Sequence, residues 1–241
     1  MKTNTMSYKC KQFLMFAGVT TAVFVAVVIV PFIYGIYLTL TSWDGVSKEK
    51  PFVGLANYVA TFADGAYWQA MGRTFLYSVI AVVLVNVVAF VLAFLVTSGV
   101  KGQNFFRAGF FTPNLIGGIV LGYIWKFVFN RAFVALGTSL SIGPLSASWL
   151  ATTGGAMLCL IIVSVWQYAG YMMLIYVAGF MSVSEDVLEA ARIDGCTNTQ
   201  SIVYVSVPLM MSSFVQCLFL TVTRCFMVYD VNLSLTNGEP F

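Results

Sequence analysis

The chain has 241 residues, of which 60% are hydrophobic and only 9% are charged. Soluble domains carry about 25% charged residues, so this composition excludes an ordinary globular protein and indicates a lipid environment. The net charge of +3 is small and predicts no nucleic-acid partner. In lipid, only helices and closed barrels pair every backbone polar group. Because the apolar runs are long and unbroken rather than alternating, we predict an all-α polytopic membrane protein.

Five apolar runs are long enough to cross a bilayer, which takes about 20 residues. The first run contains Pro31, which is expected to kink the helix or to mark a shift to an interfacial segment. A cleaved signal peptide is the alternative for this run, but the apolar stretch is too long and no small-x-small site follows it. The five predicted spans are Phe13–Leu40, Thr74–Val96, Gly109–Phe129, Gly155–Met181 and Val207–Tyr229.

Basic residues predict the orientation of the chain, because cytoplasmic connections are enriched in Lys and Arg. They precede the first span (Lys2, Lys9 and Lys11) and separate the second span from the third (Lys101 and Arg107). If all five runs cross the bilayer, these segments share one side with the connection between the fourth and fifth spans. We therefore predict that the N-terminus and the connection over residues 182–208 are cytoplasmic.

This connection holds a polar island, EAARIDGCTNTQSIVYVSVP, at residues 189–208. The pairs Ser182/Glu185 and Thr197/Gln200 have the spacing of capping boxes. Gly195 lies where a helix needs a left-handed C-terminal cap. Two short helices joined by a tight turn are therefore predicted, over Glu185–Asp194 and Asn198–Ser206, with Pro208 in the first turn of the fifth span.

The first short helix is suited to contact another protein. Ala190 and Ala191 are small enough to let a partner approach the backbone, and Glu189 can offer a carboxylate to a partner Arg. A plain solvated connector between two spans is the alternative interpretation.

Polar residues near the middle of predicted spans are costly in lipid and suggest a pathway for a solute. Neutral amides with aromatic neighbours suit an uncharged sugar or polyol, whereas hydrogen bonding between helices is the alternative use of the amides. Arg224 and Lys126 lie near the ends of their spans, where they could snorkel to the interface or contact an anionic substrate. The candidate pathway residues are Asn86, Trp166, Gln167, Tyr168, Tyr171 and Gln216.

Catalytic and cofactor sites are not indicated. The chain has no histidine, its five cysteines show no CxxC or metal-ligand spacing, and no carboxylates pair in mid-span. We therefore predict no metal site and consider an intramembrane enzyme an unfavourable alternative. A phosphate-binding loop needs a Gly-Lys dipeptide, which the 241 residues do not contain. Any ATP hydrolysis would have to come from another chain.

The island, with its EAA, Gly and Pro at fixed spacing, resembles the EAA loop of permease subunits of bacterial ABC importers. FVGLANY at 52–58, FFRAGFFTPNLIGGIV at 105–120 and VYDVNLSLTNGEP at 228–240 are similar to further elements of the carbohydrate-importer permeases. This is the family of maltose, multiple-sugar and glycerol-3-phosphate permeases. The resemblance covers nearly the whole chain in the order of the family, although Cys196 replaces the usual Ala.

The resemblance implies the transmembrane fold of a type I ABC importer and translocation by alternating access. Residues 1–73 would form an N-terminal helix and outer loop, and residues 74–241 a transmembrane core that includes the EAA loop at 182–208. Members of the family continue into a further span, so we expect a final helix to be missing here. The implied ATPase-coupling residues are Glu189, Ala190, Ala191, Asp194, Gly195 and Pro208.

The resemblance also implies partners in a bacterial cytoplasmic membrane: ATP-binding subunits that use ATP-Mg, a second permease subunit, an extracytoplasmic sugar-binding protein and lipid. This chain itself would bind no cofactor. The alternatives are import of glycerol-3-phosphate or another small polar solute by the same machinery, or a polytopic scaffold without a transport role.

Overall fold

A computed structural model describes residues 4–99, 101–143 and 146–238. Lys2 of the basic N-terminal segment, and Glu239 and Pro240 of the C-terminal motif, lie outside these ranges. Over the described residues the structure is helical apart from connecting loops and one isolated bridge between Thr41 and Phe52. The predicted all-α class is confirmed. The chain forms two compact units, residues 1–71 and 72–241.

The first unit begins with one long helix that changes type along its length. It comprises α1 (Asn4–Phe24), the π-helical η1 (Val25–Ile29) and α2 (Val30–Thr39). Pro31 lies directly after the π-helical turn. A proline has no N–H and its ring clashes with the carbonyl four residues before it, and a wider π turn accommodates both. Pro31 therefore changes the helix type without ending the first span.

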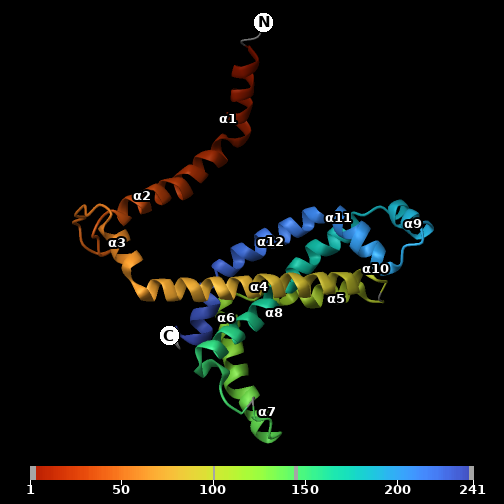
Figure 1. Ribbon diagram of the computed structural model, residues 1–241. Coiled ribbons are helices and arrows are strands. Elements are labelled where there is room, and N and C mark those ends of the chain that lie inside the picture. Colours follow the sequence, from red (N-terminus) through yellow and green to blue (C-terminus); the bar gives the residue numbers. More distant parts are fainter. Residues whose placement is uncertain (1–3, 100, 144–145, 239–241) are drawn as a thin grey trace. The chain divides into compact units, whose positions relative to one another are not determined.

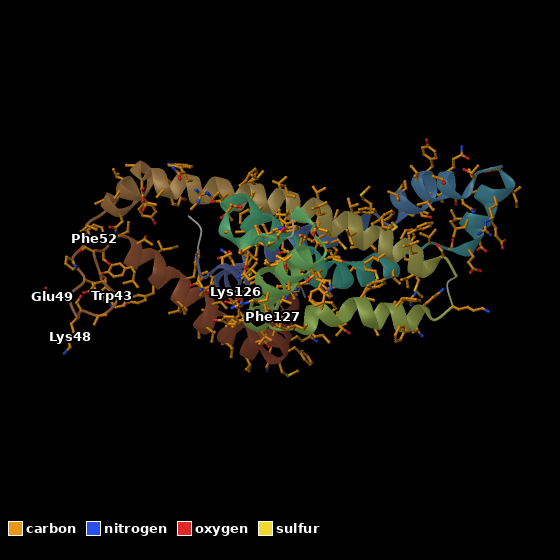
Figure 2. The ribbon with its side chains drawn as sticks, turned by 90° about the horizontal axis from the view of Figure 1, so that it is seen from below. Trp43, Lys48, Glu49, Phe52, Lys126 and Phe127 are labelled. Atoms are coloured by element: carbon orange, nitrogen blue, oxygen red, sulfur yellow. The ribbon has the colours of Figure 1, made fainter. Side chains whose placement is uncertain are left out.

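A closed loop joins α2 to α3 (Ala56–Ala63). The Ser42 N–H donates to the carbonyl oxygen of Pro51 at 3.0 Å and closes the loop. The Asn57 amide, on α3, donates to the carbonyl oxygens of Thr39 at 2.9 Å and Thr41 at 2.8 Å, and so ties α3 to the end of α2. Figure 2 shows Trp43, Lys48, Glu49 and Phe52 together on this loop.

The second unit contains the remaining helices. The division between the units falls within α4 (Gly65–Thr97), whose residues from Gly72 onward belong to the second unit. The other elements are α5 (Gln103–Phe111), η2 (Thr112–Leu115), α6 (Gly118–Phe127), η3 (Val128–Ala132), α7 (Phe133–Ser139), η5 (Trp149–Ala151), α8 (Thr153–Met181), α9 (Glu185–Ile193), α10 (Asn198–Gln200), η6 (Ser201–Ser206), α11 (Val207–Leu209), α12 (Met211–Phe226) and α13 (Tyr229–Thr236).

Four helices within the described ranges are long and apolar enough to cross a membrane, and a bent pair makes a fifth. The first, second and fourth predicted spans each coincide with one of these helices. The four helices are Met15–Thr39, Gly65–Thr97, Gly118–Ser139 and Thr153–Met181, and the bent pair is Asn198–Leu209 with Met211–Phe226.

The prediction of one continuous third span over Gly109–Phe129 was wrong. The chain forms α5 and the 3-10 turn η2, breaks where Ile116 and Gly117 are extended, and restarts as a helix that runs from Gly118 to Ser139. Pro113, in η2, cannot donate a backbone hydrogen bond, which favours an interruption here. The run is apolar on both sides of Thr112, Pro113 and Asn114, so its overall apolar character does not reveal the break.

The fifth span also departs from the prediction of a single span over Val207–Tyr229. The second short helix continues past its predicted end at Ser206 through α11, and the chain then bends by 70° before α12. Met210, at the bend, is fully buried. A side chain on Gly179 of α8 would come within 2.9 Å of Met210 and 2.5 Å of Ser213. Close packing on α8 therefore holds the bend in place.

Two apolar clusters form the core of the second unit. One lies between α4, α8 and α12, of which α8 and α12 pack along each other (Figure 1). The other lies between the first half of α4, α6, the first half of α8 and α13. Gly122 lets α13 approach α6, because a Cβ atom there would lie only 1.9 Å from the hydroxyl of Ser234 and 2.9 Å from the carbonyl oxygen of Val231.

Candidate functional site

The polar island forms a helical hairpin, α9 followed by α10, η6 and α11. It lies at the end of the α4–α8–α12 group opposite α13 (Figure 1). The turn between its arms is a Schellman motif. The Cys196 N–H donates to Ala191 O and the Gly195 N–H donates to Arg192 O, both at 3.0 Å. Gly195 has φ +83°, as the predicted left-handed cap requires.

The second arm begins with the predicted capping box. The Thr197 hydroxyl accepts from the Gln200 N–H, and the Gln200 side chain accepts from the Thr197 N–H at 2.8 Å. The capping box predicted for Ser182 and Glu185 was wrong. The Ser182 hydroxyl donates back to the carbonyl oxygen of Gly179 at 2.7 Å, and Ser184 occupies the N-cap position of α9 without a side-chain hydrogen bond.

Most of the predicted coupling residues lie on the hairpin surface. Glu189, Ala190, Asp194 and Gly195 are exposed, and so is Pro208 in α11. Ala191 differs, because it is buried on the side of α9 that packs against η6. Ala190 therefore offers a small surface to a partner, while Ala191 serves the packing of the hairpin itself.

Exposed apolar side chains cluster on the same hairpin. Ile193 is 86% exposed and Tyr204 is 73% exposed, and Val187 and Val203 are exposed as well. A polar connector in water has no reason to display this much apolar surface, whereas a protein-binding surface does. The hairpin leads directly into α12, a helix of 16 residues that is about 24 Å long.

A cavity of about 450 Å³ lies near the other end of α12. It is bounded by η2 and the start of α6, by the middle of α8, and by the end of α12 with the start of α13. Its polar lining comes from Asn114, Gln167, Tyr168, Thr223, Arg224 and Asp230.

The break before α6 forms one wall of this cavity. Residues Ile116, Gly117 and Gly118 line it, with Ile116 and Gly117 in extended conformation. Non-helical backbone at membrane depth is tolerated where it is buried in protein or borders a wet cavity. The Gln167 amide donates to the carbonyl oxygen of Ile116 at 3.3 Å, while its own oxygen is buried without a partner. The oxygen of Asn114 is likewise buried and unpartnered, so two acceptors at this wall lack a donor within the described part of the chain.

Arg224 provides charged donors at the cavity. Its guanidinium carbon lies 5.5 Å from the ring centre of Tyr168 and 5.7 Å from that of Tyr171. Cation–π contacts of this kind hold a guanidinium while leaving its N–H groups free to donate. Tyr171 does not line the cavity, so its role here is to support Arg224. The two interpretations drawn from the sequence, snorkelling and ligand contact, both remain predictions for Arg224.

Asn86 has a different environment, in the network between three helices. Its amide donates to Thr221 of α12 at 3.3 Å and its oxygen accepts from Tyr176 of α8 at 2.9 Å. It also donates within α4 to the carbonyl oxygen of Val82 at 2.8 Å. These bonds fit the alternative that polar residues in membranes join helices.

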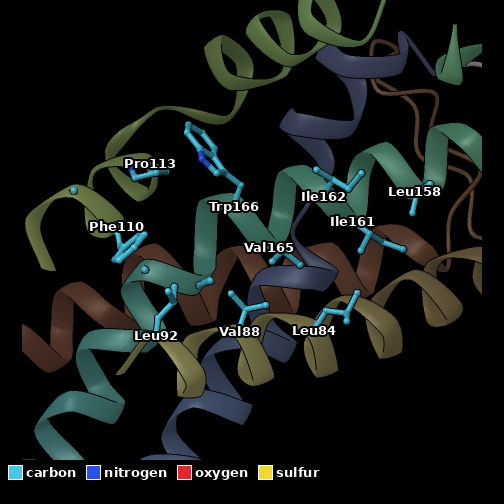
Figure 3. A pocket seen from close by; sticks show the side chains of 13 residues that line it. Leu84, Val88, Leu92, Phe110, Pro113, Leu158, Ile161, Ile162, Val165 and Trp166 are labelled. Carbon is cyan, nitrogen blue, oxygen red and sulfur yellow. The ribbon is translucent and has the colours of Figure 1, made fainter. Parts of the chain in front are cut away.

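The structure does not bring Trp166 and Gln216 to the polar cavity. Gln216 is exposed on α12. Trp166 lies edge to face with Trp125, with ring centres 5.5 Å apart. It borders a second cavity, of about 600 Å³, between α4, α5 and α8. Figure 3 shows the aliphatic side chains that line this cavity, among them Val88 and Ile162. Its surface offers almost no hydrogen bonds to a polar solute.

Thr223 was missed as a site candidate from the sequence, and so were two further lining residues of the polar cavity, Asn114 and Asp230. Both lie inside the motifs that carried the family resemblance, FFRAGFFTPNLIGGIV and VYDVNLSLTNGEP. A polar residue within such a motif was the available signal. Among the residues that the structure describes, no three His, Cys, Asp or Glu side chains are grouped so as to hold a metal.

Comparison with known proteins agrees with this architecture. Residues 86–241 match the family model of the inner membrane component of binding-protein-dependent transport systems. The chain is 39% identical to the probable starch degradation products transport system permease protein AmyD of Thermoanaerobacterium thermosulfurigenes, over 94% of this chain and 77% of that protein. It is 30% identical to the multiple sugar-binding transport system permease protein MsmF of Streptococcus mutans, over 87% and 72%.

A solved structure shares the fold. It is a bacterial ABC transporter involved in the import of the acidic polysaccharide alginate, with a TM-score of 0.76 and 16% identity over 95% of this chain and 85% of that chain. At this identity the likeness concerns the fold. Together with the family match, it confirms the predicted importer architecture. The chain is therefore a membrane-spanning permease subunit, not an enzyme, and belongs to the inner membrane components of binding-protein-dependent transport systems.

Proposed function

We propose that this subunit imports a carbohydrate, with residues 182–208 as the loop that couples it to a separate ATPase. The sugar assignment is supported by the names of its relatives, which transport starch degradation products and multiple sugars. The polar cavity, with amides, a tyrosine and free acceptor atoms, is chemically suited to such a solute. The observation that carries the coupling proposal is the hairpin with its exposed apolar residues, Ile193 and Tyr204.

The complete transporter would contain ATP-binding subunits that use ATP-Mg, a second permease subunit and an extracytoplasmic sugar-binding protein. The N-terminus and the hairpin would face the cytoplasm, where ATP is available. Residues 74–241 would form the transmembrane core, and residues 1–73 an N-terminal helix and outer loop. Glu189, Ala190, Asp194, Gly195 and Pro208 would lie at or near the ATPase surface, with Ala191 shaping the hairpin from inside.

In this proposal, α12 carries force from the ATPase to the solute pathway. Closure of the ATPase dimer would displace the hairpin, and the bend at Met210 would pass the displacement to α12. Contact of Met210 and Ser213 with Gly179 makes the end of α8 move with them. Arg224 lies in the last turn of α12 and Gln167 on α8, so both walls of the polar cavity would shift relative to the break before α6.

Uptake by membrane vesicles tests the proposal. Vesicles that contain the chain with its ATPase, second permease and binding protein would be given radiolabelled maltotriose, with and without internal ATP. We expect ATP-dependent uptake that unlabelled maltotriose suppresses and glycerol-3-phosphate does not. Suppression by glycerol-3-phosphate alone would establish the alternative substrate, and uptake that is independent of ATP would contradict coupling to an ATPase.

A further inference from the structure

The polar cavity contains one cationic and one anionic side chain that do not pair with each other. Arg224 and Asp230 both line it. Within the described part of the chain, Arg224 contacts the rings of Tyr168 and Tyr171 and forms no ion pair, and Asp230 forms none either. Two opposite charges beside the same cavity, each without a counter-ion, leave five N–H donors and a carboxylate available to a ligand.

The other polar residues that line the cavity also suit a ligand that donates and accepts hydrogen bonds. Gln167 is only 6% exposed and its side-chain oxygen has no hydrogen-bond partner. The oxygen of Asn114 is in the same state. A buried acceptor without a donor costs about 1–3 kcal/mol, and a ligand hydroxyl can supply that donor. Sugar hydroxyls both donate and accept, so one ligand can satisfy the amide oxygens, Asp230 and Arg224 together.

We propose that Arg224 and Asp230 are a charge-balanced pair of specificity-determining residues, which makes this cavity select an uncharged saccharide. The proposal rests on the proposed function and names the substrate class of that site. Because the two charges cancel, a neutral ligand gains hydrogen bonds from both. An anionic sugar would gain attraction from Arg224 but meet repulsion from Asp230. Removing Asp230 would leave the cavity positive and open it to acidic saccharides.

The charge balance is measurable without a ligand. Thr223→Cys and, as a second reporter, Met227→Cys place a thiol on the cavity wall, in a background with Cys10 and Cys196 replaced by Ser. The readout is the ratio of modification rates by an anionic and a cationic methanethiosulfonate in membranes containing the full chain. For a unit charge about 8 Å away, Coulomb interaction changes each rate by roughly 3- to 30-fold, depending on the effective dielectric constant.

We expect Asp230→Asn to raise the anionic-to-cationic ratio and Arg224→Gln to lower it at both reporters. Because the two rates change in opposite directions, the ratio should change by about the square of the factor for each rate, roughly tenfold or more. Asp186→Asn on α9 and Arg131→Gln in η3 remove the same charges from residues that do not line the cavity, and they should leave the ratio unchanged. An unchanged ratio in Asp230→Asn and Arg224→Gln would overturn the proposal.

Protection of the reporter thiols tests the ligand class. Maltotriose should slow modification of Thr223→Cys, and trigalacturonate should do so only when Asp230→Asn is also present. Protection by trigalacturonate with Asp230 intact, or by neither sugar, would overturn the assignment of an uncharged saccharide. Failure of ATP-dependent uptake by the unmodified chain would instead count against the proposed function, so the two failures are distinguishable.

Discussion

Replacement of Gly195 separates the shape of the hairpin from its contact with a partner. The residue has φ +83°, and no atom beyond its chain neighbours lies within 4 Å of a Cβ built there. Alanine and tryptophan would therefore meet the same backbone strain, about 1–2 kcal/mol for a left-handed residue, and no clash within this chain. Asparagine tolerates this conformation better than either.

A difference between the two strained variants must then come from a partner. The assay is the number of substrate molecules imported per ATP hydrolysed in proteoliposomes of the complete transporter. We expect Gly195→Asn to import as many substrate molecules per ATP as the wild type. Gly195→Ala should import modestly fewer, because 1–2 kcal/mol of strain lowers the equilibrium constant for forming the closed turn by about 5- to 30-fold. Gly195→Trp should lose at least a further tenfold in coupling. Equal coupling in the Ala and Trp variants would refute the idea that an ATPase surface lies against this turn, and a larger loss with Asn than with Ala would refute the conformational argument.

Helix packing, interhelical hydrogen bonds and the loop between α2 and α3 can each be tested by substitution. Asn86→Leu should lower the free energy of unfolding in detergent by about 1–2 kcal/mol, because two interhelical hydrogen bonds are lost. Gln216→Leu, on the exposed face of α12, is the control and should not lower it. Equal losses in the two variants would contradict the hydrogen-bond network. Gly122→Ala should lower the free energy of unfolding by about 1–3 kcal/mol, because it overpacks α6 against α13. Gly109→Ala, whose added Cβ meets nothing within 4 Å, should not destabilise the protein. A Gly122→Ala variant of unchanged stability would contradict the close approach of the two helices. Hydrogen bonds from backbone N–H groups lower the pKa of Asp44 to about 2. The stabilisation that this carboxylate gives the loop is therefore complete above its ordinary pKa and is lost as pH falls through about 2. Infrared titration of the wild type, with Asp44→Asn as the control, measures this pKa, and a value near 3.8 would contradict the prediction.

Local rules predicted the elements that depend on neighbouring residues. The capping box of Thr197 and Gln200 and the left-handed Gly195 follow from spacing alone, and both are present. The Ser182–Glu185 pair had the same spacing but failed, because the Ser182 hydroxyl is drawn to the carbonyl oxygen of Gly179 at the end of α8. Spacing identifies a possible cap, and the position of the preceding helix decides whether it forms.

The two breaks could not be predicted from hydropathy, because tertiary contacts stabilise them. The Gln167 amide, 51 residues away in the sequence, donates a hydrogen bond to the carbonyl oxygen of Ile116 and so stabilises the interruption there. Close packing of Met210 and Ser213 on Gly179 stabilises the bend at Met210. For the same reason the polar cavity was only partly foreseen. Gln167 and Tyr168 were identified as polar or aromatic residues in mid-span, whereas Asn114 is placed on the cavity only by the break itself.

We propose that the hairpin meets a separate ATPase in the cytoplasm. The most direct test is a photocrosslinking amino acid in place of Ile193, the most exposed apolar residue of the hairpin, in cells that produce the whole transporter. We expect a covalent adduct with a protein that contains a P-loop, formed from the cytoplasmic side. An adduct with an extracytoplasmic protein, or with lipid alone, would contradict it.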